Sequence, residues 1–196
     1  MTADERELIR KFCSGDAEAY DAVYASYGAR IYRFCHRLCG NTAYAEDVTQ
    51  EVFLAAFQGR QGFQGRASLN TWLYKIARNH CLVRLSDSNN RNVSLPDAET
   101  DSALSVDPMP STLIRLTLDQ AISTLPAALR ETFLLVKAEG MTCREAAAVL
   151  EIPAGTVKYR VHEATGRLRE LLALEAAVET SWALKVPLIK EIIHEM

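Results

Sequence analysis

A run of cations with interleaved aromatic rings, and with no acid, occupies residues 60 to 86. The cations are Arg60, Arg66, Lys75, Arg78 and Arg84, the rings are Phe63, Trp72 and Tyr74, and the short polar groups are Gln64, Ser68, Asn70, Thr71 and Asn79. Cations neutralise phosphates, rings stack on unpaired bases, and polar side chains contact base edges. The pattern indicates a nucleic-acid contact. An amphipathic helix with a solvated basic face and a buried Trp explains the composition equally well.

A second set of polar residues has helical spacing. Asp47, Gln50, Glu51 and Leu54 follow the spacing i, i+3, i+4, i+7, so a helix would carry them on one stripe. The residues between them, among them Val48, Val52 and Phe53, would face a core. We expect Asp47 and Glu51 to be exposed. The stripe could bind a basic groove on another protein, or it could be the solvent side of the helix.

A capping box begins a third pattern, in which the Thr142 hydroxyl caps a helix and Glu145 reaches back to it. We expect a short helix over 143–150, a turn over 151–154 that contains Pro153, and a second helix over about 155–172.

The second helix of this hairpin would be amphipathic. Its apolar stripe is Val157, Val161, Ala164, Leu168 and Leu171, and its other faces carry Thr156, Lys158, Tyr159, His162, Glu163 and Arg167. Such a hairpin predicts a helix-turn-helix with a recognition helix for the major groove. A purely structural hairpin with a solvated outer face is the alternative.

Helical periodicity and few breakers extend from residue 4 to 84, with helices expected before Ser14, over 17–38, from about 41 to 57, and over 68–85. Residues 87–111 hold three prolines and five acids against one Arg and predict a linker. The sequence therefore predicts an all-α chain of two small helical domains joined by a flexible acidic linker, the second with the helix-turn-helix. The expected boundaries are 1–86, 87–111, 112–172 and a C-terminal extension over 173–196.

Bulk properties restrict the function further. The chain has 196 residues, 25 acids and 22 bases, so a nucleic-acid contact must come from patches. The odd number of scattered cysteines, five, and the charged start without an apolar core predict a cytoplasmic protein without membrane insertion. Cys35 and Cys39 lack two further ligands nearby, so no metal is expected. The sequence has neither a phosphate-binding glycine loop nor a catalytic-triad pattern, so we expect neither an enzyme nor a cofactor.

Three segments together resemble a bacterial sigma factor of the extracytoplasmic-function (ECF, group 4) family. AEDVTQEVFLAAF resembles that family's polymerase-binding helix, and FQGRASLNTWLYKIARN resembles its promoter-melting and minus-ten segment. LPAALRETFLLVKAEGMTCREAAAVLEIPAGTVKYRVHEATGRLRELL resembles its minus-thirty-five domain. The segments occur in the family's order within residues 5 to 172, with no middle domain.

The resemblance implies roles for individual residues. Asp47, Gln50, Glu51 and Leu54 would bind the clamp helices of core RNA polymerase. Phe63, Gln64, Arg66, Ser68, Asn70, Thr71, Trp72, Lys75, Arg78 and Asn79 would bind the minus-ten element, the loop 63–68 holding a flipped base. Arg144, Thr156, Lys158, Tyr159, Arg160, His162 and Arg167 would bind the minus-thirty-five duplex. Tyr159, Glu163 and Thr165 depart from the family pattern, in which a small Ser and more basic residues are common.

The implied function is that of a sigma factor, which binds core RNA polymerase, recognises and melts promoter DNA, and initiates transcription. Its partners would be core RNA polymerase, promoter DNA and an anti-sigma factor. A sigma-like decoy that sequesters an anti-sigma factor would have no use for the basic aromatic segment. A stand-alone helix-turn-helix regulator would leave residues 1 to 86 unexplained.

The C-terminal extension is longer than the family core requires. Its apolar side chains are Trp182, Leu184, Val186, Leu188, Ile189, Ile192 and Ile193. We expect residues 181–196 to form an amphipathic helix that packs on the protein's own domains or on a regulator.

Overall fold

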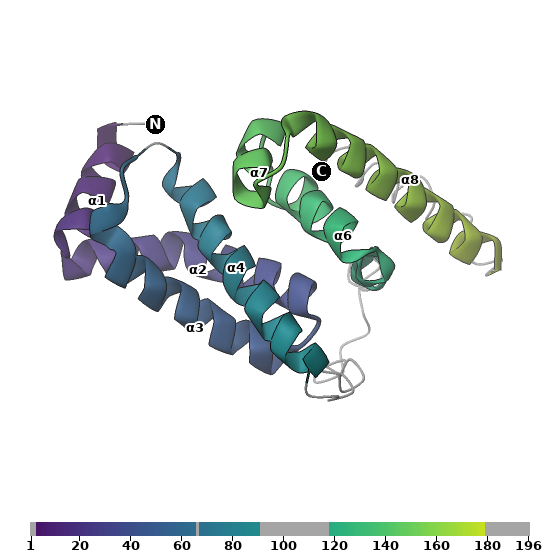
Figure 1. Cartoon of the computed structure of the whole chain (residues 1–196), viewed down its shortest axis with the longest axis horizontal. Coiled ribbons are helices and arrows are strands. Elements are labelled where there is room, and N and C mark those ends of the chain that lie inside the picture. Colours follow the sequence, from purple (N-terminus) through teal and green to yellow (C-terminus); the bar gives the residue numbers. More distant parts are fainter. Residues whose placement is uncertain (1–2, 66, 91–117, 179–196) are drawn as a thin grey trace. The chain divides into compact units, whose positions relative to one another are not determined.

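The computed structural model describes residues 3–65, 67–90 and 118–178, and Figure 1 shows their helices. These residues form two compact units and contain no strand. The predicted all-α class is therefore confirmed. The predicted residue Arg66, the rest of the predicted linker over 91–111, and residues 179–196 of the extension lie outside the described residues.

The first unit is built from α1 (Ala3–Ser14), α2 (Ala17–Cys39), α3 (Thr42–Gly59) and α4 (Leu69–Asn90), with a short 3-10 turn, η1 (Arg60–Gly62), after α3. Figure 1 shows α2, α3 and α4 side by side. Their contact faces bury large side chains such as Phe34, Phe53 and Tyr74, and the Phe34 and Tyr74 rings meet edge to face at 5.2 Å. Each such burial contributes about 1.5–3 kcal/mol.

The corner between α2 and α3 forms where the sequence predicts it. Gly40 takes a left-handed conformation with φ 67°, and its N–H donates to the carbonyl of His36. Asn41 then caps α3, because its side-chain oxygen accepts a hydrogen bond of 2.9 Å from the Tyr44 N–H. This corner sets α2 and α3 antiparallel, with Tyr24 against Phe53 at a ring distance of 4.8 Å.

The second unit contains helical residues 118–124, α6 (Ala127–Phe133), the π-helical turn η2 (Leu134–Ala138), most of α7 (Cys143–Leu150) and α8 (Ala154–Val178). The apolar side of α8 packs on α6, and Val157, Ala164 and Leu168 are fully buried. None of the helices in the described ranges is long and apolar enough to span a membrane.

Two helices extend beyond their predicted ends. Helix α4 continues to Asn90, so the first four residues assigned to the linker are helical, and α8 continues to Val178, so the first six residues assigned to the extension are helical. In both places no Gly or Pro stops the helix, and residues 173–178 are Ala, Leu, Glu and Val, mostly strong helix formers.

Candidate polymerase and nucleic-acid interfaces

The polar stripe predicted on α3 exists. Asp47, Gln50 and Leu54 are exposed on one face, Leu54 by 56% although it is apolar. The core positions predicted between them, Val48, Val52 and Phe53, are buried.

Glu51 differs from the prediction of a fully exposed acid. Its side chain is 39% exposed and bonds across to α4: Arg84 Nη2 donates to Oε1 at 2.6 Å, and His80 Nδ1 lies 3.1 Å from Oε2. Arg84 also lies 3.9 Å from Asp47. Partial burial raises the pKa of the Glu51 carboxyl, but the bonds and charges of Arg84 and His80 outweigh burial and leave this pKa below its usual value.

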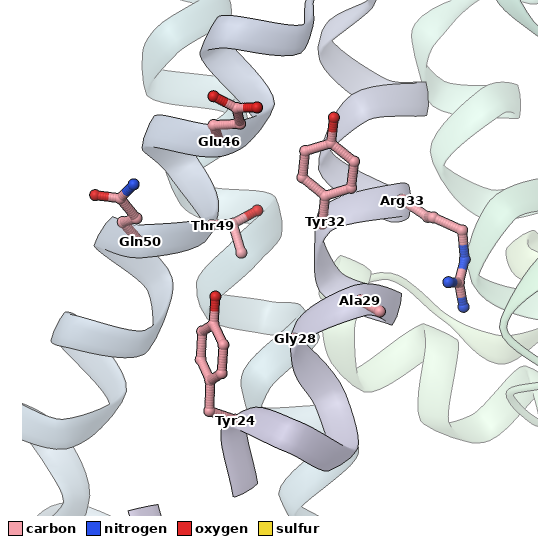
Figure 2. Close-up of a pocket in the computed structure, with 8 residues that line it drawn as sticks. All are labelled: Tyr24, Gly28, Ala29, Tyr32, Arg33, Glu46, Thr49 and Gln50. Carbon is pink, nitrogen blue, oxygen red and sulfur yellow. The ribbon is translucent and has the colours of Figure 1, made fainter. Parts of the chain in front are cut away.

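A groove between α2 and α3 adjoins the stripe, and the sequence analysis did not find it. Figure 2 shows Tyr24 and Tyr32 on α2, with Gly28 between them, facing Glu46, Thr49 and Gln50 on α3. The groove has a volume of about 310 Å³. A Cβ at Gly28 would lie 3.5 Å from the Tyr24 ring, which is ordinary van der Waals contact, so this glycine lies directly against that ring. The spacing of Tyr24, Gly28 and Tyr32, four residues apart, is the signal that could have revealed it.

The loop before α4 presents an aromatic pair. Phe63 and Trp72 are half-buried with their rings 5.0 Å apart, and Gly59 lies beneath the Trp72 ring. Trp72 is therefore neither a fully buried core residue nor a free wedge. Gln64 is exposed next to this pair.

The first turn of α4 uses some predicted DNA contacts for its own structure. The Ser68 hydroxyl accepts a hydrogen bond of 3.1 Å from the Thr71 N–H and lies 2.9 Å from the Thr71 hydroxyl. Thr71 is 4% exposed, and its bonds to Ser68 stabilise the start of α4; its contact with DNA stays a prediction. Asn70 Oδ1 is buried without a hydrogen-bond partner, an acceptor that an incoming donor could satisfy.

Further along α4, the side chains of Lys75 and Arg78 are half-buried and Asn79 is exposed. Beyond them Leu82 and Val83 are exposed apolar side chains, Val83 by 61%. The predicted minus-ten residues that the structure describes, all but Arg66, therefore lie on the loop before α4 and on its first three turns.

The helix-turn-helix has the predicted geometry. The Thr142 hydroxyl accepts from the Glu145 N–H at 3.2 Å, and the Glu145 carboxylate accepts from the Thr142 N–H at 2.9 Å, which is a complete capping box. In the turn, Glu151 adopts a left-handed conformation with φ 57°. The carbonyl of Pro153 then accepts from the Thr156 N–H and starts α8.

The outer faces of this motif carry most of the predicted minus-thirty-five residues: Arg144, Lys158, Tyr159, His162 and Arg167 are exposed, and Thr156 is half-buried. Arg160 is less exposed than these residues. Its side chain is 25% exposed, and its Nη1 lies 3.9 Å from Oε1 of Glu131, a buried acid of α6. Its contact with the minus-thirty-five duplex stays a prediction.

Comparison with known proteins finds one family match in each half of the chain. The Sigma-70 region 2 family matches residues 23–91, and the Sigma-70, region 4 family matches residues 115–168. The chain is 30% identical over 179 residues to ECF RNA polymerase sigma factor SigW of Bacillus subtilis, covering 85% of this chain and 96% of the relative. It is 31% identical over 172 residues to RNA polymerase sigma-H factor of Pseudomonas aeruginosa, covering 82% and 89%.

Two helical units with these surfaces define a promoter-specificity subunit of RNA polymerase. The chain belongs to the ECF family of RNA polymerase sigma factors. Members of this family are transcription initiation factors and not themselves enzymes.

Solved structures share the fold. CnrH, in its complex with the cytosolic domain of CnrY, has a TM-score of 0.67 at 22% identity and covers 87% of this chain and 97% of its own. The sigma factor RpoE of Bartonella quintana, in complex with the anti-sigma factor NepR, has a TM-score of 0.64 at 24% identity, covering 80% and 98%.

Proposed function

We propose that the first unit binds core RNA polymerase through α3 and opens the minus-ten element through the loop and start of α4, while the second unit binds the minus-thirty-five duplex through α8. The observation that carries this proposal is the separation of the two surfaces of the first unit. The exposed acidic and apolar stripe lies on α3, and the cationic, aromatic segment lies on α4 and the loop before it.

The polymerase contact consists of Asp47, Gln50 and Leu54 together with the groove beside Gln50. Leu54 provides apolar area at the centre, and Asp47 provides charge at the rim, which is the usual composition of a protein interface. Glu51 lies at the edge of this contact, because its two carboxylate oxygens already interact with His80 and Arg84 of α4.

The minus-ten contact depends on stacking. Extruding a base costs a few kcal/mol, and stacking on an aromatic ring returns about 1–3 kcal/mol per base. The Phe63–Trp72 pair offers such rings at the surface, and Gln64, Asn70 and Asn79 offer polar groups nearby. This site needs neither a metal ion nor a nucleophile.

The minus-thirty-five contact uses the exposed face of α8. Lys158 and His162 are four residues apart on one face, with Tyr159 exposed by 65% beside them. Cations on that face can bind phosphates while neighbouring side chains reach base edges in the major groove. Tyr159 makes this face bulkier than a small residue would, so we expect the chain's preferred upstream sequence to depend on it.

Run-off transcription tests the proposal. Core polymerase supplemented with the full chain should give specific transcripts from genomic promoter fragments, and core polymerase alone should not. A Lys158→Ala, His162→Ala double variant should lose promoter-dependent transcripts but still bind core polymerase. Absence of both polymerase binding and specific transcripts would reject the proposed function.

We also propose an anti-sigma factor as a regulator of this chain. The support is its likeness to RpoE, which was solved with the anti-sigma factor NepR. A sigma-like decoy would bind such a factor but give no transcripts, so the run-off assay distinguishes a decoy from a sigma factor.

A further inference from the structure

Three buried thiols meet in the core of the first unit. Cys35 and Cys39 lie one turn apart on α2, and Cys81 comes from α4. All three are free and buried, and the Cys81 thiol lies within hydrogen-bonding reach of both others. The sequence shows only the α2 pair; the third thiol joins it through the packing of α4 on α2.

The surroundings make two of these thiols chemically unequal. A hydrogen bond from Cys81 lowers the pKa of the Cys39 thiol, burial opposes this effect, and the charge of Arg84 adds to the lowering. Hydrogen bonding to Cys35 and Cys39, together with burial, raises the pKa of Cys81. Cys39 is therefore the more readily ionised thiol and Cys81 its protonated neighbour, and the thiolate is the nucleophilic form of cysteine.

Metal binding is not the chemistry that this arrangement favours. Within the described ranges no group of three or more His, Cys, Asp or Glu side chains is placed to hold a metal ion. Contact between thiols from two different helices instead suits bond formation between sulfur atoms.

We propose that Cys39 and Cys81 are a peroxide-oxidised pair that closes into a disulfide between α2 and α4. The Cys39 thiolate attacks one oxygen of hydrogen peroxide; the O–O bond breaks, hydroxide leaves, and Cys39 becomes a sulfenic acid. The released hydroxide takes the Cys81 proton and becomes water, the Cys81 thiolate attacks the Cys39 sulfur, the S–O bond breaks, and the disulfide forms as hydroxide leaves. The peroxide is reduced by the two electrons that the thiols lose.

Peroxide is close to water in size, so local opening of the helix contact is sufficient for access. The bond would join two cysteines that are about 40 residues apart in the chain. Closing a loop of this length lowers the entropy of the unfolded chain and so stabilises the folded one. It would also fix α4 one turn before Arg84, the residue that holds Glu51. The proposal is independent of the proposed function, since it concerns only the chemistry of the first unit.

The test uses the full chain with Cys13→Ser and Cys143→Ser, which removes the two half-buried thiols. After hydrogen peroxide treatment, remaining thiols are alkylated under denaturing conditions and non-reduced peptides are analysed by mass spectrometry. We expect loss of two of the three thiols, a Cys39–Cys81 linked peptide that a reductant reverses, and a rise in Tm of roughly 10 °C.

Matched variants separate this chemistry from packing. Cys35→Ala should keep the linkage, and Cys81→Ala should stop at a Cys39 sulfenic acid that dimedone traps. If Cys81→Ala does not fold, dimedone added during oxidation of the parent chain should trap the same intermediate. Arg84→Gln should slow the loss of Cys39 thiol several-fold and Arg84→Lys should restore it. Three unreacted thiols, a linkage that uses Cys35 instead of Cys39, or an unchanged rate in Arg84→Gln would overturn the proposal.

Discussion

The bridge from Glu51 to α4 makes a quantitative prediction. Glu51→Gln removes the charge that Arg84 and His80 contact and keeps the size of the side chain. The exposed fractions of the three side chains are 39%, 35% and 33%, so water screens the interactions. Charge-assisted hydrogen bonds contribute about 1.5–3 kcal/mol when buried, and at this exposure we expect a loss of about 1 kcal/mol.

The reversal Glu51→Lys should cost more, about 2 kcal/mol, because it places a second cation beside Arg84. Asp47→Asn is the matched control: it also removes one acid from the same helix face, but Asp47 is 59% exposed and 3.9 Å from Arg84. It should change stability by less than about 0.5 kcal/mol.

The assay is urea unfolding followed by the fluorescence of Trp72, in a Trp182→Phe background so that only the first unit reports. Glu51→Gln should lower the urea midpoint by about 0.5–1 M, and Asp47→Asn should leave it unchanged. Equal midpoints for wild type and Glu51→Gln would refute the bridge as a source of stability.

The bridge also predicts a pH dependence. Because the folded-state pKa of Glu51 lies below its unfolded value, the unfolded chain binds more protons and the bridge's contribution rises with pH. The contribution is complete above the ordinary carboxyl range of about pH 4–5 and is lost as pH falls through the lowered pKa. The stability gap between wild type and Glu51→Gln should therefore be constant near neutral pH and close in acid. A gap that widens below pH 4 would contradict the assignment.

Three further predictions concern other parts of the chain. Trp72→Ala should destabilise the first unit by about 1–3 kcal/mol, less than a fully buried Trp would, and should also reduce permanganate-reactive open DNA relative to a variant of equal stability. Lys158→Ala should weaken binding to the upstream duplex and reduce its salt slope by about 0.9, whereas Arg160→Ala should remove a cation that lies 3.9 Å from buried Glu131 and lower the free energy of unfolding by about 1–3 kcal/mol; equal salt slopes for both variants would contradict this division. Glu151→Gly should raise the stability of the folded chain by up to about 1 kcal/mol in thermal unfolding, since glycine relieves the left-handed backbone, and destabilisation would show that the Glu151 side chain does more than occupy the turn.

Local signals explain why most helix ends could be predicted from the sequence. Gly40 and Asn41 end one helix and start the next, and Thr142 and Glu145 cap α7 as the sequence predicts. Such caps involve residues three or four positions apart, so a sequence contains all their partners. The ends of α4 and α8 carry no such signal, and both helices run further than predicted.

Side-chain partners from distant helices explain why the surroundings of two site residues could not be predicted. Periodicity placed Glu51 on an exposed stripe, and the family resemblance assigned Arg160 to the minus-thirty-five duplex. Their partners come from other helices: Glu51 bonds to residues 29 and 33 positions later, and Arg160 faces Glu131 of α6. A helical period identifies a face but not the element that packs against it. Spacing alone still held a clue, because Asp47 and Glu51 are four residues apart on α3, as are His80 and Arg84 on α4.

The same reasoning applies to the acid-free window of residues 60 to 86, which first indicated DNA binding. The first and last cations of this window, Arg60 and Arg84, interact with other residues of the protein. Arg60 lies 4.0 Å over the Phe57 ring and donates to the Phe57 carbonyl, and Arg84 holds Glu51. We therefore expect DNA to contact the middle of the window, residues 63 to 79. An acid-free window overstates a nucleic-acid surface because a cation at a helix contact contributes to composition whether or not it reaches a phosphate. The pair formed by Phe63 and Trp72 is the more specific indication, because rings at a surface can stack on unpaired bases, which a count of cations does not show.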